Sequence, residues 1–396
     1  MTRGNARGIV AAARTNSIAS VHRGYATATA ALPTTMPAVV LDAPGPPDAL
    51  RFVDDHPTPA CGDGAGDVVV KVSCCAVAYR DILDRQGAFP FMQRPTIPGH
   101  EFSGTVVAAA GGGDLRVGDR VASLHWAQRD GWPAPLKGGG AGPVGSFLGL
   151  TCDGGYAGYV AAHESAFVPV PEGWAPEQAA PVVSTYGTFW HGAVTKGALR
   201  PGESVLVTGA SGGVGTAAVQ VASKLGCRVV AVTSAEDKVP YLVDELGLPR
   251  ERVVVCADGA KMHKAVQKVP GMEGGVDLAF ECVGGPTFGA SLRALTPGGR
   301  MVLIGNVSNA TCDLPLGYCI VNSVSVIGSD SCSRAEMAEL FAFLDANGLR
   351  PSVDEVLPLS DAAEAHRRVE GRGVCGRLVL RVDEGEAGGA WPVGGA

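Results

Sequence analysis

The pattern of apolar and polar residues changes character about half-way along the chain. Short apolar runs separated by Gly, Pro and Asp turns, such as VVVKVSCCAV, GTVVAAA and DRVASL, predict β-strands in the first part. From about Ser184, strand-like runs such as ESVLVTG alternate with stretches of helical periodicity such as GTAAVQVASKLG. Strands that alternate with helices predict an α/β fold with a parallel, doubly wound sheet.

The same pattern divides the chain into segments. We expect a β-rich substrate domain over residues 36–170 and a dinucleotide-binding α/β domain over 171–330. Residues 331–383 form a closing segment with one helical stretch, RAEMAELFAFLDANG, and strand-like runs such as GRLVLRV. The composition of EGEAGGAWPVGGA, residues 384–396, predicts a disordered tail.

The first 41 residues contain no Asp or Glu, but they carry several Arg among Ala, Ser and Thr. This composition is typical of an organellar transit peptide, which we expect over residues 1–30. The stretch RGYAT resembles a mitochondrial processing site, so we expect the mitochondrial matrix as the location. A plastid or cytoplasmic location and an ordinary disordered terminus are the alternatives.

Composition narrows the choice of partners. Of the 396 residues, 46% are hydrophobic and 18% are charged, which is typical of a globular protein. The net charge of −7 disfavours nucleic acid, and no apolar run approaches the ~20 residues that a membrane span needs. The eleven cysteines include no C-x-x-C motif, which favours reduced thiols over a disulfide framework. A small-molecule substrate is therefore expected, with neither nucleic acid nor membrane as a partner.

A glycine-rich turn lies between a strand and a helix in VLVTGASGGVGT, residues 205–216. Gly209 would permit the tight turn, Gly212 would let the backbone approach a pyrophosphate, and Gly215 would allow close packing of helix on strand. The helix N-terminus would then face the phosphates, where unpaired N–H groups favour anions. This arrangement predicts a dinucleotide cofactor.

The next strand-like run ends in VVAVTSAEDK. A site selective for NAD would place Asp or Glu at the end of this strand to hold the ribose hydroxyls. The chain instead has Thr233 and Ser234 there, with Lys238 shortly after, although Glu236 is also close. Hydroxyls and a cation suit a 2′-phosphate, so we expect NADPH; a solvated Lys238 on the helix surface is the alternative.

With these motifs in place, the chain resembles the medium-chain dehydrogenase/reductase superfamily, and within it the zinc-free quinone oxidoreductase branch. The stretches STYGTFWHGAV, VLVTGASGGVG, ECVGGPTFGASLRALTPGGRMVLIG and GRLVL carry the resemblance, which covers about residues 36–383. YRDIL also resembles a stretch of the enoyl reductase modules in fatty acid and polyketide synthases. The resemblance implies a GroES-like β domain interrupted by a Rossmann domain, and a homodimer paired through residues 324–329, VSVIGS.

The resemblance also bears on zinc. The ligand positions of the superfamily's zinc alcohol dehydrogenases correspond to Ala78, His100 and Ser184. Two of these three residues lack a good zinc ligand, so no metal is expected. A rebuilt site that uses Cys75, His100 and Glu101 is the alternative.

The resemblance further implies the site residues. Tyr79 and Arg80, in a loop expected to face the cofactor, and His100 are the catalytic candidates, with Asp81 as the expected hydrogen-bond partner of His100. The cofactor-binding candidates are Thr188 at the nicotinamide, Gly212, Gly213 and Val214 at the pyrophosphate, Ser234 and Lys238 at the 2′-phosphate, and Cys282, Gly284 and Gly305 at later strand ends.

Together these features predict an NADPH-dependent, zinc-independent reductase. Its substrate would be a quinone or an activated C=C bond, as in an enone, an alkenal or an enoyl thioester, because such acceptors need no Lewis acid. Two alternatives remain. One is a zinc alcohol dehydrogenase with displaced ligands. The other is a non-catalytic NADPH-binding protein, since Ala78 stands where quinone reductases usually carry Asn.

Overall fold

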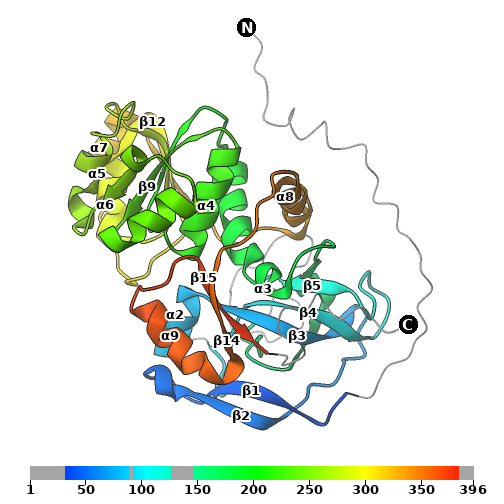
Figure 1. The fold of residues 1–396 in the computed structure, drawn as a ribbon. Helices are drawn as coiled ribbons and strands as arrows, with labels where there is room; N and C mark the ends of the chain where they lie inside the picture. The colour runs from blue at the N-terminus through cyan, green and yellow to red at the C-terminus, as the bar shows by residue number, and fades with distance from the viewer. Residues whose placement is uncertain (1–31, 90–91, 126–146, 383–396) are drawn as a thin grey trace. The chain divides into compact units, whose positions relative to one another are not determined.

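The computed structural model describes residues 32–89, 92–125 and 147–382, which form a parallel sheet, a larger mixed sheet and a two-stranded hairpin (Figure 1). The expected transit peptide and C-terminal tail lie outside these residues. Within the described ranges, no helix is long and apolar enough to cross a membrane.

The parallel sheet has the strand order β10-β9-β8-β11-β12-β13, and every neighbouring pair in it is parallel. This order reverses between β8 and β11, which is where a doubly wound sheet binds its ligand. The expected Rossmann-type sheet is therefore confirmed. Its strands are β8 (Ser204–Val207), β9 (Arg228–Thr233), β10 (Val253–Val255), β11 (Val276–Glu281), β12 (Leu295–Leu303) and β13 (Ser325–Gly328).

The larger sheet has the order β14-β15-β3-β4-β5-β7, with β6 also paired to β3. Its first two strands come from the closing segment, so the chain returns to the first domain after the parallel sheet. This is the GroES-like arrangement expected from the sequence. The strands are β3 (Asp67–Val77), β4 (Glu101–Ala109), β5 (Arg120–Ser123), β6 (Tyr159–His163), β7 (Phe167–Pro169), β14 (Val353–Pro358) and β15 (Arg377–Arg381), beside the hairpin of β1 (Thr35–Leu41) and β2 (Leu50–Pro57).

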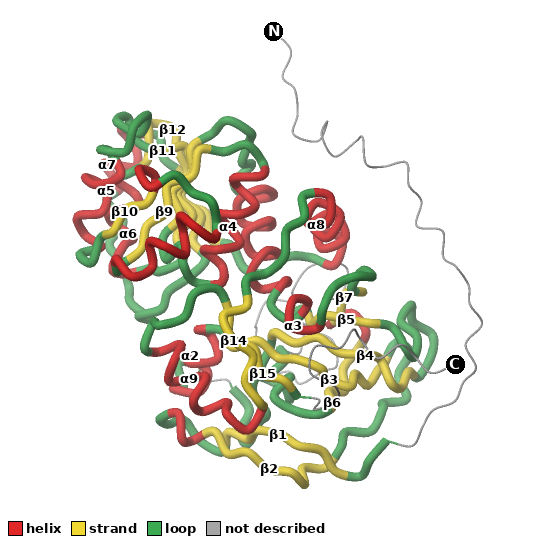
Figure 2. Tube along the Cα trace, in the orientation of Figure 1, coloured by secondary structure: helices red, strands yellow, loops and turns green. Residues whose placement is uncertain are grey.

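Helices flank both sheets (Figure 2). Those nearest the parallel sheet are α4 (Gly213–Lys224), α5 (Met262–Val266), α6 (Gly285–Arg293) and α7 (Leu316–Asn322). The others are α2 (Tyr79–Gln86), α3 (Pro176–Ala179), the π-helices η3 (Val183–Gly187) and η4 (Trp190–Lys196), α8 (Arg334–Ala346) and α9 (Ala362–Glu370). Arg85 of α2 donates to Glu370 of α9 at 2.6 Å, which joins these two helices side by side.

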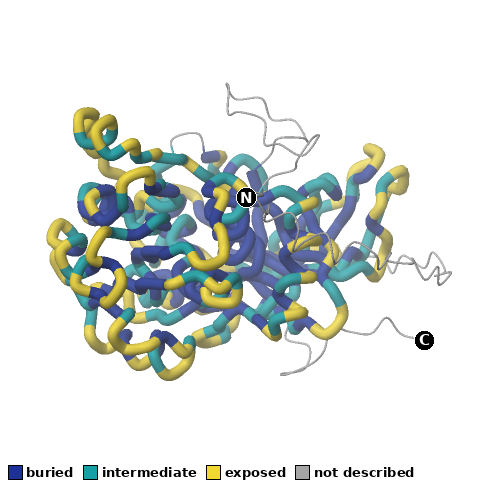
Figure 3. The backbone as a smooth tube through the Cα atoms, turned by 90° about the horizontal axis from the view of Figure 1, so that it is seen from above, coloured by how far each residue is buried: buried dark blue, intermediate teal, exposed yellow. Residues whose placement is uncertain are grey.

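Two large hydrophobic clusters form the cores behind the site, where Figure 3 shows many buried segments. Trp174, Phe189 and Phe280 belong to the cluster that spans η3, η4 and one face of the parallel sheet. Phe102 and Tyr156 belong to the cluster inside the GroES-like sheet. The strands and helices that carry the polar groups of the site therefore pack against dense apolar cores, which fix their positions.

One local prediction was wrong. Tyr79 and Arg80 lie in the first turn of α2 and not in a loop, because the Asp81 carboxylate accepts the N–H of Ala78 at 2.8 Å and starts the helix there.

One end of the parallel sheet bears on assembly. β13 is the edge strand, and the preceding helix α7 exposes Leu316, Ile320 and Val321 by 66%, 75% and 83%. Exposed edges and apolar patches of this kind are often covered by a partner. The homodimer through residues 324–329 stays a prediction.

Candidate active site

A buried histidine–carboxylate pair lies at the start of α2 and β4. His100 Nδ1 is 2.9 Å from Asp81 Oδ1, and both side chains are almost fully buried. Burial lowers the pKa of His100 to about 3 and raises that of Asp81 to about 6. The ring is therefore neutral at pH 7, and its one N–H is used as the donor to Asp81. The expected hydrogen bond between these residues is present.

Arg80 points from the first turn of α2 into a partly apolar setting. Its Nε lies 3.3 Å from Asp84 Oδ2, and its guanidinium carbon lies 4.7 Å from the ring centre of Phe147 and 5.8 Å from that of Phe89. Its Nη2 is buried without a hydrogen-bond partner in the described part of the chain. A fixed cation with one free donor can bind a carbonyl or enolate oxygen. Tyr79, the neighbouring candidate, is partly exposed.

Arg377 joins the two domains at the glycine turn. Its guanidinium forms a bidentate pair with the buried Glu101, at 3.0 and 3.2 Å. A side chain at Gly213 would lie 2.6 Å from Arg377 Cζ, so this cation lies against the first residue of α4. Gly376, which immediately precedes β15, donates its N–H to Ser211 O at 2.9 Å. Arg377 therefore stands where a pyrophosphate would bind.

Sequence reasoning missed Arg377. The residue belongs to GRLVL, a run that carried the family resemblance and was otherwise interpreted only as a strand. Its distance along the chain from the glycine turn hides the contact. The available signal was the position of Arg377: it is a cation at the start of a strand that the family fold returns to the first domain.

The other predicted pyrophosphate residues lie at the crevice of the parallel sheet. Gly212 is the N-cap of α4, and Val214 lies in its first turn. Gly215 has to be glycine, because a Cβ there would lie 2.2 Å from the carbonyl oxygen of Gly209, whose φ is +59°. This cradle fits a dinucleotide pyrophosphate.

The later strand ends meet the same crevice. A Cβ on Gly209 would lie 3.9 Å from that of Cys282, and one on Gly305 would lie 2.0 Å from the carbonyl oxygen of Cys282. Gly284 has φ +90° and is the N-cap of α6. The structure therefore brings the residues after β8, β11 and β12 together, as the strand-end prediction required.

Thr188 and Ser184 lie on neighbouring turns of the helical segment from 183 to 196. Both are 6% exposed. The hydroxyl of Ser184 is buried and has no hydrogen-bond partner among residues 32–89, 92–125 and 147–382. A buried hydroxyl of this kind is available to a bound molecule.

The two residues predicted to bind the 2′-phosphate, Ser234 and Lys238, differ in their exposure to solvent. Ser234 follows β9 and is exposed. Lys238 is buried, its Nζ donates to Gly373 O at 2.6 Å, and the same atom lies 3.6 Å from Cys375 Sγ. Lys238 is therefore not the solvated helix residue considered as the alternative. It fastens the loop before Arg377 to the parallel-sheet domain.

His125 was also missed by sequence reasoning. It lies two residues after β5, and its ring meets that of His100 edge-on, with centroids 4.8 Å apart and planes at 69°. Its Nε2 is buried without a hydrogen-bond partner in the described ranges. A single His after the strand run DRVASL gave no sequence signal of its own.

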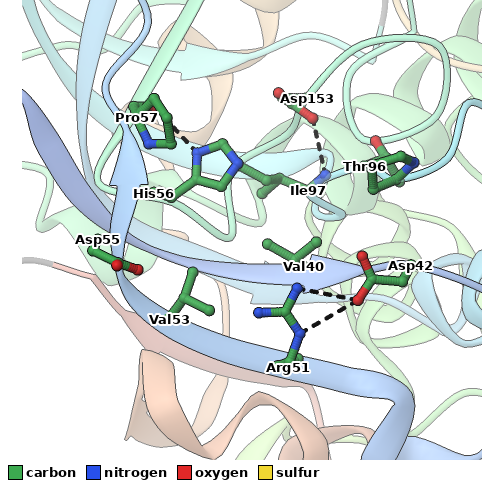
Figure 4. Close-up of a pocket in the computed structure, with 11 residues that line it drawn as sticks. Val40, Asp42, Arg51, Val53, Asp55, His56, Pro57, Thr96, Ile97 and Asp153 are labelled. Atoms are coloured by element: carbon green, nitrogen blue, oxygen red, sulfur yellow. Dashed lines mark hydrogen bonds and ion pairs between the residues drawn. The ribbon is translucent and has the colours of Figure 1, made fainter.

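A hollow of about 420 Å³ lies apart from these groups, over the β1–β2 hairpin (Figure 4). Asp42 and Arg51 form an ion pair at 3.1 Å across it, and Asp153 accepts the N–H of Ile97 at 2.9 Å. No predicted site residue lines this hollow. Asp42, Arg51 and Asp153 are thus already paired, and the hollow lies apart from every predicted site residue, so we do not assign the reaction to it.

Comparison with known proteins fits this geometry. Residues 64–172 match the model of the alcohol dehydrogenase GroES-like domain, and residues 213–346 match that of the zinc-binding dehydrogenase family. The first range contains His100 and Asp81, and the second contains helix α4, which follows the glycine turn.

Full-length relatives agree. The chain is 32% identical to acryloyl-coenzyme A reductase of Sulfurisphaera tokodaii over 87% of this chain and 100% of that protein. It is 27% identical to human quinone oxidoreductase, over 85% and 94%. A mycobacterial protein solved in complex with NADPH superposes with a TM-score of 0.71 at 27% identity, over 88% and 100%. The chain thus belongs to the medium-chain dehydrogenase/reductase superfamily and is a nicotinamide-dependent oxidoreductase of it.

Proposed function

We propose that this protein is an NADPH-dependent, zinc-independent reductase of a C=C bond conjugated to a carbonyl, with an enoyl thioester as the preferred substrate. The observation that carries the proposal is Arg80, a partly buried cation whose Nη2 is buried and has no hydrogen-bond partner among the described residues. Its ion-pair partner Asp84 has a carboxylate oxygen within 4.8 Å of a ring nitrogen of the neutral His100. The name of the acryloyl-coenzyme A reductase relative supports the thioester. The quinone oxidoreductase relative keeps quinones as the second candidate.

The chain's residues supply what this reaction needs. A bound reduced nicotinamide would supply a hydride to the β-carbon of the substrate. The C=C π pair would then form a double bond between the α-carbon and the carbonyl carbon, and the carbonyl π pair would move onto the oxygen to give an enolate. The Arg80 Nη2 stabilises the resulting enolate oxygen. Tyr79, adjacent and partly exposed, is the candidate donor of the proton that the α-carbon takes up. The glycine cradle at Gly212 and Gly213 and the guanidinium of Arg377 hold the cofactor's pyrophosphate.

Preference for NADPH follows from the end of β9. No acidic side chain ends this strand, and the exposed Ser234 is free to meet a phosphate. The ammonium of Lys238 lies four residues on and keeps its third donor beyond those that face Gly373 O and Cys375 Sγ. A hydroxyl and a cation together favour the 2′-phosphate.

A family-implied zinc ion does not fit these residues. Ala78 offers no ligand atom, and its backbone N–H is bound to Asp81. Among the described residues, one group of three side chains has the chemistry and spacing to hold a metal ion: Asp81, Asp84 and His100. Within it, His100 is already bonded to Asp81, and Asp84 is paired with the permanent cation of Arg80. A divalent ion there would have to displace both interactions.

The function is tested by a screen of NADPH oxidation with the purified protein. Short enoyl-coenzyme A thioesters, enones, alkenals and quinones are compared at equal concentration, each with NADPH and with NADH. We expect the highest kcat/KM for an enoyl thioester with NADPH. Faster turnover of a quinone, or oxidation of a primary alcohol alone, would contradict the proposal.

Zinc independence makes a separate prediction. We expect well under one zinc per chain by elemental analysis, and reductase activity that is unchanged after treatment with a chelator. The reason is that His100 Nε2 is left without the Cys partners of a tetrahedral site. About one zinc per chain together with activity abolished by the chelator would show that the ligands have been rebuilt around His100.

A further inference from the structure

His125 stands at a position that the fold fixes tightly. β5 pairs with β4, and the hydroxyl of Ser123 both donates to His100 O at 2.7 Å and accepts the N–H of Phe102 at 2.8 Å. This hydroxyl ties the end of β5 to the start of β4. The ring of His125, two residues on, is therefore held edge-on against His100.

The unpartnered Nε2 of His125 calls for an explanation. A buried polar atom left without a hydrogen bond destabilises the folded state, because it has lost its hydration and gained no partner. A phenylalanine would give the same edge-on contact without this cost. Native structures contain few such atoms, and at a functional site an unpaired donor or acceptor commonly forms its hydrogen bond with the ligand. The free Nη2 of Arg80 belongs to the same neighbourhood: the Arg80 guanidinium carbon lies 4.7 Å from the ring centre of Phe147, and the next residue, Leu148, donates its N–H to His125 O at 3.2 Å.

The two histidines have different donor capacity. Burial, reinforced by His100, Arg80 and Arg377, keeps the pKa of His125 well below its usual range, so its ring is neutral. A neutral imidazole has one N–H. That of His100 is used on Asp81, whereas His125 has an uncommitted Nε2. A neutral imidazole donor can polarise a carbonyl without having to lose a proton.

We propose that His125 is a catalytic residue whose Nε2–H donates a hydrogen bond to the substrate's thioester carbonyl oxygen, beside the Nη2 of Arg80. This inference rests on the proposed function and deepens it. Two donors on one oxygen, one charged and one neutral, form a site for the enolate that develops as the β-carbon is reduced. His100 then acts through His125 by holding its ring, and is a positioning residue.

The test compares His125→Phe, which keeps the ring contact, with His125→Gln, which keeps a side-chain donor. His56→Phe, on the β1–β2 hairpin, is the matched control. Steady-state kinetics with the best enoyl thioester, the Kd for NADPH by fluorescence and the thermal midpoint are measured for each. We expect His125→Phe to lower kcat by about 100- to 1,000-fold, as the loss of one oxyanion donor does elsewhere.

The other readouts separate catalysis from structure. The Kd for NADPH and the thermal midpoint of His125→Phe should match those of the unmutated protein, and His125→Gln should recover at least a tenth of its kcat. Unchanged kcat in His125→Phe would overturn the inference, as would an equal loss in the Phe and Gln variants. If the unmutated protein reduces no enoyl thioester, the proposed function fails, and the quinone reaction then replaces the thioester in the same comparison.

Discussion

Replacing Arg377 with alanine is expected to raise the Kd for NADPH by roughly 10- to 150-fold, the equivalent of a lost charge-assisted hydrogen bond of about 1.5–3 kcal/mol. Arg377 lies against Gly213 at the N-terminus of α4, where the helix N–H groups favour phosphate. A guanidinium at this place adds a forked, permanent charge to that site. Titration of cofactor fluorescence measures the effect.

Two further variants make the result specific. Arg377→Lys keeps the charge but loses the fork, so an intermediate affinity is expected. Arg381→Ala, at the other end of β15, changes a cation of the same strand and should leave the Kd unchanged. Equal affinity in the Ala variant and the unmutated protein would show that Arg377 serves only its ion pair with Glu101.

The Ala variant should also be less stable. Glu101 is 1% exposed and would lose both of its charge-assisted hydrogen bonds from Arg377 at once. Breaking a buried ion pair from one side commonly costs about 3–5 kcal/mol. Combining Arg377→Ala with Glu101→Gln should return much of this stability but none of the cofactor affinity, which separates the two roles of the arginine.

The parts of this site that were predictable from the sequence depend on short stretches of chain. The turn at 205–216 contains its strand, its glycines and its helix within twelve positions, so its role could be inferred before its geometry was known. The pairing of His100 with Asp81 was expected from residues 19 apart, with the help of the family resemblance. The alternation of strands and helices was enough for the parallel sheet.

The parts that were missed depend on distant contacts. Arg377 meets Glu101 across 276 residues, and only the return of β15 to β3 brings the two together. His125 contacts His100 only because β5 pairs with β4, which brings the two rings together. The buried state of Lys238 depends on Gly373, 135 residues later. No local sequence pattern predicts these contacts. They depend on how the strands and helices pack in the folded protein, and the sequences of those strands and helices carry no distinguishing motif.

Replacing Arg80 with alanine is expected to lower both activity and stability. Activity falls because the enolate oxygen loses its charged donor. Stability falls because Asp84, whose side chain is 2% exposed, loses its ion-pair partner at 3.3 Å. A loss of about 3–5 kcal/mol in the free energy of unfolding at pH 8.5 is the usual result of breaking a buried pair.

The pH dependence of that loss has a definite sign. Burial already raises the pKa of Asp84 to about 7 despite Arg80, and removing Arg80 takes away the interactions that lower it. The folded protein then binds a proton at Asp84 more tightly than the unfolded chain, in which an Asp titrates near ~3.9. The folded state is therefore favoured at low pH, and this contribution is lost as pH rises through 7.

Urea unfolding of the variants at pH 5.5 and pH 8.5 measures the effect. Arg80→Ala should be destabilised relative to the unmutated protein much more at pH 8.5 than at pH 5.5. The double variant Arg80→Ala with Asp84→Asn has no carboxylate to bury, so its deficit should be smaller and should not grow with pH. A deficit of Arg80→Ala that is equal at both pH values would mean that Asp84 is not left as a buried charge, and that Arg80 supports the fold through its contacts with Phe89 and Phe147 instead.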